Sequence, residues 1–301
     1  MGYGRGLVFA YYRFLNLFFI ATNFFNTRMR LMFSGLARET HVYAMRGKRR
    51  MKLDVYRPRG AEGPVPVIVY AHGGGWIVGW RRLIEPAFAR QVKRGYALVS
   101  FTYTFTNQDS WPAQIHDTKA AIRWVRANAD RFGFDTDKIV LTGASAGGHL
   151  ACVSGLSGKG KLEGDLGNAE MSSDVCGIAV FYPPADLPAT ITQGFVAGRC
   201  VEALIGGKAE VRLKELHEAT PISYARSDAP PLLVLHGTHD HIVPHAHGSA
   251  LVSAIQDAGG NAKLISLEKR AHADWRFSAP SNMREIEAFL DRVTNRDQNA
   301  A

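Results

Sequence analysis

A serine in a glycine-rich turn is the first residue of this chain whose setting could support chemistry. Residues 138–151 read KIVLTGASAGGHLA, so an apolar run leads into a tight turn around Ser145 and a helical pattern follows at once. Gly143 and Gly147 flank the serine, and so sharp a strand-to-helix turn needs small neighbours because larger side chains would collide with both elements. The pattern G-x-S-x-G therefore predicts a nucleophilic Ser145, although the same letters also suit a purely structural turn.

Two downstream residues could activate this serine. A serine hydroxyl is a weak nucleophile until a base takes its proton, and a third group must hold that base in one tautomer. Asp240 lies five residues after Leu235 and His272 lies five residues after Leu267, so each follows the end of a predicted strand. Serine, acid and histidine also come in the order expected for a turn of this kind. We predict that Ser145, Asp240 and His272 form a catalytic triad.

Other side chains compete for these roles. The chain has 11 histidines, and His72 and His149 are expected to form structural hydrogen bonds. A histidine-rich loop resembles a metal cluster, but no second set of Cys or carboxylate ligands accompanies it, so neither a metal nor a cofactor is expected. The loop histidines are His236, His239, His241, His245 and His247. The weaker acid candidates are Asp228, Asp257 and Asp274.

A second glycine motif, HGGGW at residues 72–76, follows the apolar run PVIVYA. Glycines let backbone N–H groups approach a substrate carbonyl without a Cβ in the way. We expect the N–H groups of Gly74, Gly75 and Ala146 to form an oxyanion hole, and Trp76 to contact substrate. Taken alone, HGGGW also fits a tight structural turn.

These motifs together resemble a known family. HGGGW, GASAGGHLA, LHGTHDHIVP and the downstream AH, with LDVYRP and PAQIHDTKAAIRWVRANADRFGFD, look like the hormone-sensitive-lipase-like α/β-hydrolase carboxylesterases, over about residues 45–295. The resemblance implies hydrolysis of small or medium acyl esters through an acyl-enzyme on Ser145. Kynurenine formamidases share the elbow and a similar HGG-x-W loop and are the alternative. Ala271 departs from the glycine that the family usually has before its histidine.

The elements that position these residues alternate between strands and helices. This alternation predicts an α/β-hydrolase fold, with a mostly parallel sheet covered by helices on both faces and an antiparallel hairpin at its edge. A small helical cap is expected at residues 185–220, beyond the carboxyl end of a strand, where ligands bind in such sheets. The predicted strands are 41–45, 51–57, 66–71, 97–103, 139–142, 175–182, 231–235 and 262–267. The predicted helices are 85–94, 113–131, 195–205, 211–217, 245–258 and 281–294.

Composition restricts the class of protein and its partners. With 301 residues, 46% of them hydrophobic, the chain can bury one large core, so residues 39–301 are predicted to form a single hydrolase domain. The three cysteines lack disulfide or zinc spacing, so buried, reduced thiols and a cytoplasmic location are expected. The net charge of +9 is dispersed and belongs to no nucleic-acid module, so the predicted partner is a small-molecule ester. The oligomeric state stays open.

Residues 1–38 form a separate, hydrophobic N-terminal segment. The apolar run that begins at Leu7 and ends at Phe25 is interrupted by Arg13, Asn16 and Asn23, whose spacing places them along one stripe of a helix. Such a pattern favours two interpretations, a lid that covers the active site or a helix that lies in a membrane interface. A helix that spans the membrane and an ordinary packed helix are less favoured. Association with a membrane surface is therefore an open alternative. A second alternative is a membrane-associated protein with a hydrolase fold and no catalytic activity, but the complete triad argues against it.

Overall fold

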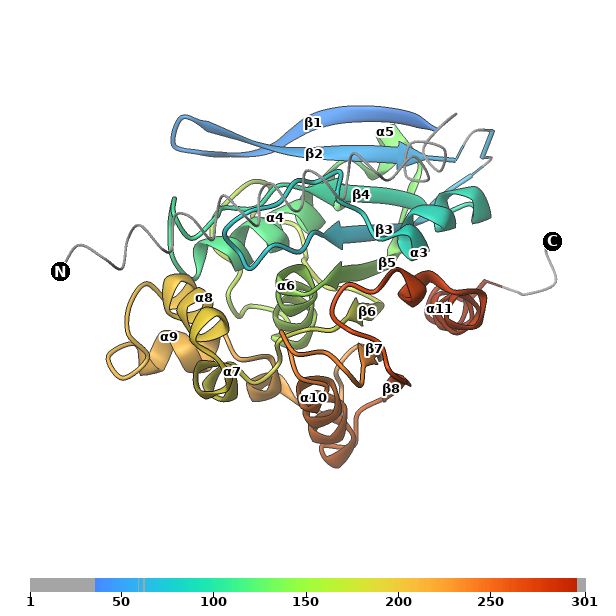
Figure 1. Cartoon of the computed structure of the whole chain (residues 1–301). Coiled ribbons are helices and arrows are strands. Elements are labelled where there is room, and N and C mark those ends of the chain that lie inside the picture. The colour runs from blue at the N-terminus through green and yellow to red at the C-terminus, as the bar shows by residue number, and fades with distance from the viewer. Residues whose placement is uncertain (1–35, 59, 62, 297–301) are drawn as a thin grey trace.

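The computed structural model describes residues 36–58, 60, 61 and 63–296. These residues form an eight-stranded sheet in the order β1-β2-β4-β3-β5-β6-β7-β8 (Figure 1). The β1–β2 and β2–β4 pairs are antiparallel and every other pair is parallel, which confirms the predicted fold class and the edge hairpin. The strands are β1 (Ala37–Arg46), β2 (Arg49–Arg57), β3 (Val65–Ala71), β4 (Ala97–Phe101), β5 (Phe134–Ala144), β6 (Gly177–Phe181), β7 (Leu232–Gly237) and β8 (Ala262–Leu267).

Helices cover both faces of this sheet. Side chains of successive strand residues point to opposite faces, so Val67 and Val69 of β3 enter one core while Ile68 and Tyr70 enter the other. Helices α4, α6 and α10 pack on the first core, and α3 and α11 pack on the second. Their bounds are α3 (Pro86–Ala89), α4 (Ala113–Ala127), α6 (Ala146–Leu156), α10 (Ala246–Asp257) and α11 (Pro280–Val293), with 3₁₀ turns η1 (Arg90–Arg94), η2 (Pro221–Tyr224) and η3 (Trp275–Ser278).

The helix predicted at residues 113–131 is interrupted at Asn128. There α4 ends and the short helix α5 (Ala129–Phe132) begins. Asn128 leaves the helical region, with φ −114° and ψ 18°, and both its side-chain amide and its backbone N–H donate to the carbonyl of Trp124. The asparagine side chain thus shares the acceptor of the last hydrogen bond of α4, and a local side-chain bond of this kind is typical of a residue at which a helix ends.

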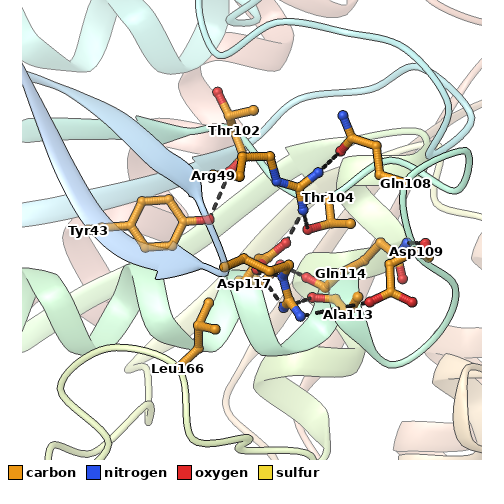
Figure 2. A network of polar contacts seen from close by, with 12 residues as sticks. Tyr43, Arg49, Thr102, Thr104, Gln108, Asp109, Ala113, Gln114, Asp117 and Leu166 are labelled. Atoms are coloured by element: carbon orange, nitrogen blue, oxygen red, sulfur yellow. Dashed lines mark hydrogen bonds and ion pairs between the residues drawn. The ribbon is translucent and has the colours of Figure 1, made fainter.

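A polar network fastens the edge hairpin to the start of α4 (Figure 2). Asp117 of α4 is fully buried and accepts hydrogen bonds from Arg46 at 2.8 Å and from the backbone N–H of Thr104 at 2.7 Å. Arg49, across the hairpin turn, donates to the Thr104 hydroxyl at 2.7 Å and to Gln108. Because a buried carboxylate needs partners of this kind, the network fixes the segment that leads from β4 into α4.

The cap at residues 185–220 contains three helices, one more than predicted (Figure 1). They are α7 (Leu187–Gln193), α8 (Phe195–Ile205) and α9 (Leu213–Glu218). The additional helix is α7, whose N-cap residue Asp186 accepts a hydrogen bond from the N–H of Ala189 at 3.0 Å. The cap lies on the side of the molecule toward which the arrowhead of β3 points, and Trp111 N–H anchors it by donating to Leu204 O at 2.7 Å.

The run from Leu7 to Phe25 lies outside the described residues, so its role and the boundary at residue 38 stay predictions. Within the part of the chain that the structure describes, no helix combines the length and apolarity that crossing a membrane requires. The expectation that all cysteines are buried is wrong for two of them. Cys152 in α6 is buried, whereas Cys176 and Cys200 are partly exposed because they lie before β6 and in the cap, at the margins of the core.

Candidate active site

Ser145 occupies a strained turn between β5 and α6. Its backbone has φ 53° and ψ −124°, a combination that side-chain-bearing residues rarely adopt and that costs about 1–3 kcal/mol. The turn closes because its glycines lie against neighbouring backbone: a Cβ on Gly147 would lie 2.0 Å from Ala71 O, and one on Gly143 would lie 2.5 Å from Gly147. Close backbone contacts therefore explain why this turn needs glycine on either side of Ser145.

The three predicted triad side chains are in contact. Ser145 Oγ lies 3.0 Å from His272 Nε2, and His272 Nδ1 lies 2.7 Å from Asp240 Oδ2. They come from loops after β5, β7 and β8, which end at one edge of the sheet because these strands are parallel. The arrangement suits proton transfer from the hydroxyl to an imidazole that the carboxylate holds in one tautomer.

Asp240 is itself held firmly. It is 5% exposed, and its other oxygen, Oδ1, accepts hydrogen bonds from the N–H groups of Ile242 and Val243, both at 2.9 Å. Burial acts to raise the pKa of Asp240, but hydrogen bonds from His236, His272 and Val243 and the charge on His272 outweigh it and hold the pKa well below its usual range. Asp240 is therefore an ionised acceptor for His272.

The loop HGGGW brings backbone donors beside Ser145. Gly74 has φ 129°, and a Cβ there would lie 1.9 Å from Val78 O, so only glycine fits. Among the described residues, no group accepts a hydrogen bond from the N–H of Gly74 or Gly75. Ala146 is the first residue of α6, and N–H groups of a first helical turn have no acceptor within the helix. These three donors are available for an oxyanion, and their role stays a prediction.

Trp76, the last residue of the HGGGW loop, is buried and links the loop to the cap. The indole is 3% exposed and donates to His149 Nδ1 at 3.2 Å. Because that nitrogen accepts, the His149 proton resides on Nε2, which lies 2.6 Å from Ala219 O at the end of α9. Burial lowers the pKa of His149 to about 4, so the ring stays neutral. The structure thus shows a connecting Trp76, while its contact with substrate stays a prediction.

The competing residues have other partners. His236 bonds Val243 O, His245 bonds Ser266, and His247 bonds Gln193, while His239 and His241 are outside the buried interior. Within the described ranges, no group of His, Cys, Asp and Glu is arranged to hold a metal ion. Asp228 pairs with Arg226, Asp257 is exposed at the end of α10, and Asp274 pairs with Arg276. Ala271 is also exposed, so its methyl group fits where glycine is usual.

Three residues around this site were not predicted from the sequence to belong to it. The ring of Tyr182 lies 4.4 Å from that of His272, centroid to centroid, and the Tyr182 hydroxyl donates to Glu85 at 2.8 Å. Tyr182 follows β6 with φ 38°, a conformation that no sequence pattern marks. Cys200 of the cap also approaches the HGGGW loop, because a Cβ on Gly75 would lie 3.6 Å from its sulfur.

Comparison with known sequences gives a family match. A family profile described as BD-FAE matches residues 53–255. Esterase LipQ of Mycobacterium tuberculosis is 35% identical over 243 residues, which cover 79% of this chain and 57% of LipQ. Esterase LipC of the same organism is 32% identical and covers 68% of this chain and 52% of LipC. The chain thus spans a little over half the length of these relatives.

Solved structures are similar over most of the chain. A truncated carbohydrate esterase from gut microbiota superposes with a TM-score of 0.76 at 26% identity, covering 86% of this chain and 96% of that one. A propionate-bound esterase from Thermogutta terrifontis superposes with a TM-score of 0.70 at 27% identity, covering 85% of this chain and 94% of that one. A structure of esterase 2 from Thermogutta terrifontis has also been solved with the enzyme phosphorylated by paraoxon.

Proposed function

The chain belongs to the BD-FAE family, and we propose that it is a serine carboxylesterase that hydrolyses small or medium acyl esters through an acyl-enzyme on Ser145. Membership agrees with the resemblance to the hormone-sensitive-lipase-like α/β-hydrolases. The observation that carries the proposal is the continuous contact from Asp240 through His272 to Ser145, at 2.7 and 3.0 Å.

The proposed reaction has two halves, and the same histidine serves both. Ser145 Oγ attacks the ester carbonyl carbon as its proton passes to His272 Nε2, and the N–H groups of Gly74, Gly75 and Ala146 bind the resulting oxyanion. Collapse of this intermediate breaks the bond to the alcohol oxygen, which leaves with the proton from His272. A water molecule then attacks the acyl-enzyme, gives its proton to His272, and releases the acid when Ser145 recovers that proton.

The cap supports the assignment to shorter acyl groups. Cys200 of α8 approaches Gly75 of the proposed oxyanion loop, so the cap stands close to the position that we propose for the substrate carbonyl. The similar esterase from Thermogutta terrifontis was solved with propionate, a three-carbon acid. We therefore expect the acyl chain to be short, in the range from acetate to about hexanoate.

A substrate panel tests this proposal. Nitrophenyl esters from acetate to palmitate are compared with N-formylkynurenine, whose hydrolysis is the mark of the formamidase alternative. We expect kcat/KM to be highest for an ester of six or fewer carbons and to be lost in Ser145→Ala. A chain that cleaves only N-formylkynurenine, or none of these compounds, contradicts the proposal.

We also propose that the run from Leu7 to Phe25 contacts a membrane surface, on the strength of its aromatic content and the basic Arg28 and Arg30 beside it. Flotation of the full chain with anionic and neutral vesicles tests this. Binding to anionic vesicles that weakens with salt supports the proposal, because salt screens exposed charges. A chain that floats with neither vesicle behaves as expected of a lid or a packed helix.

A further inference from the structure

A second carboxylate lies behind the proposed base. The ring of Tyr182 packs 4.4 Å from the ring of His272, and its hydroxyl donates to Glu85 Oε1 at 2.8 Å. Tyr182 is 2% exposed, and its N–H donates to Leu235 O at 2.9 Å, so both ends of the residue are fixed. A chain of contacts therefore runs from His272 through Tyr182 to Glu85, separate from the one that runs to Asp240.

Ordinary structural roles do not account for Glu85. It occupies the N-cap position of α3, yet its side chain makes no capping hydrogen bond. Among the ion pairs of residues 36–58, 60, 61 and 63–296, none includes Glu85, whereas Asp54 and Asp117 pair with arginines. Glu85 is half-buried, and a carboxylate withdrawn from water usually has a cation beside it.

The positive charge that acts on Glu85 is that of His272, the base that the reaction protonates. The titratable groups around it are Tyr70 on β3, Tyr182 after β6, and His272 after β8. Burial is the largest influence on Glu85 and raises its pKa, while the Tyr182 hydrogen bond and positive charge on His272 act in the opposite direction. Positive charge on His272 therefore favours the carboxylate form of Glu85.

We propose that Glu85 is a positioning residue of this active site, which acts on His272 through Tyr182 and places a second negative charge beside the imidazolium formed in the reaction. The inference rests on the proposed esterase function. Asp240, with His236 behind it, contacts the imidazole at Nδ1, while the ring of Tyr182 packs against the imidazole and its hydroxyl donates to Glu85. One carboxylate thus bonds the base directly, and a second is connected to it through Tyr182.

Glu85→Gln separates charge from contact, because glutamine keeps an oxygen that accepts from the Tyr182 hydroxyl. Loss of the charge leaves the imidazolium less stable, so the acid limb of the kcat/KM profile should move to lower pH, by about half to one pH unit. We expect kcat on nitrophenyl acetate to fall roughly three- to tenfold, with KM changed by less than about twofold. Glu85→Asp keeps the charge and should leave the acid limb near its wild-type position.

Asp291→Asn is the matched control. Asp291 also accepts a hydrogen bond from a buried tyrosine, Tyr96, at 3.0 Å, but it lies in α11 and also pairs with Arg94. This variant should lose stability without a change in the pH profile. An acid limb at the same pH in Glu85→Gln as in the wild type overturns the inference. If Glu85→Gln does not fold, Glu85→Asp provides the test, because it keeps the charge. An acid limb of Glu85→Asp that lies at lower pH than that of the wild type would then overturn the inference.

Labelling with a fluorophosphonate distinguishes this result from failure of the proposed function. A wild-type chain that is labelled at Ser145 and hydrolyses esters, with a Glu85→Gln profile that matches it, refutes only the role of Glu85. A wild-type chain that is neither labelled nor active refutes the esterase itself. A shifted profile in Glu85→Gln, reversed in Glu85→Asp and absent in Asp291→Asn, establishes the role.

Discussion

The substitution Asp240→Asn should nearly abolish turnover while the protein stays folded. Asp240 Oδ1 accepts from the N–H groups of Ile242 and Val243, both at 2.9 Å, so an asparagine must keep its oxygen on that side. Its NH₂ group then faces His272 Nδ1, which lies 2.7 Å from the other carboxylate oxygen in the wild type. Two backbone donors thus decide the orientation of the new side chain.

This orientation fixes the wrong histidine tautomer. With an NH₂ donor at Nδ1, the His272 proton moves to Nε2, the nitrogen that must accept the proton of Ser145 Oγ. In a serine protease triad the equivalent change lowers kcat by about 10⁴, which corresponds to about 5.5 kcal/mol of transition-state stabilisation. Folding should suffer by only about 1–2 kcal/mol, because the two backbone hydrogen bonds persist.

The assay is hydrolysis of nitrophenyl acetate, with thermal unfolding measured alongside. Asp274→Asn is the matched control: Asp274 lies two residues from His272 but pairs with Arg276, so its loss should change kcat by less than about tenfold. An Asp240→Asn variant that keeps more than about a tenth of wild-type kcat would refute the tautomer argument. So would an equal loss in the control.

Three further outcomes are expected. Gly147→Ala should destabilise the fold by more than about 3 kcal/mol and Gly148→Ala by less. The reason is that the added Cβ would lie 2.0 Å from a backbone atom at Gly147 and 3.1 Å from one at Gly148. Denaturant titrations that show the reverse order would contradict this prediction. The free energy of unfolding should fall as the pH is lowered from 6.5 to 4, because burial lowers the pKa of His72 and His149 from 6.5 to about 4. Over this range the unfolded chain takes up protons that the folded chain does not. Equal free energies of unfolding at the two pH values would contradict this prediction. Cys200→Phe should lower kcat/KM for butyrate relative to acetate esters, and an unchanged ratio would remove the cap from the specificity argument.

The mostly parallel sheet was predictable because each central strand carries a strong local signal. Continuous apolar runs such as PVIVYA mark strands buried on both faces, and β3 is buried at every position. The helix α7 was not predicted, since LPATITQ has little apolar periodicity, although Asp186 followed by a proline in the first turn is a recognisable helix start. The break at Asn128 depends on one side-chain hydrogen bond, which a helical pattern cannot reveal.

The candidate site divides in the same way. The meeting of Ser145, Asp240 and His272 could be predicted because each follows a strand, and parallel strands bring their carboxyl ends to one edge. Glu85 and Tyr182 could not, since their proximity to His272 arises from tertiary packing of segments far apart in the chain. The link from Trp76 through His149 to the cap is hidden for the same reason.

Covalent labelling of the wild-type chain with an organophosphate, followed by peptide mapping, tests the central claim most directly. The strained turn, the contact with His272 at 3.0 Å and the backbone donors of the HGGGW loop, which bond to none of the described residues, all point to one hydroxyl. We expect a single modification at Ser145, loss of esterase activity in proportion to it, and neither labelling nor activity in a folded Ser145→Ala. Labelling at another serine, or full activity in Ser145→Ala, would contradict the assignment of Ser145 as the nucleophile.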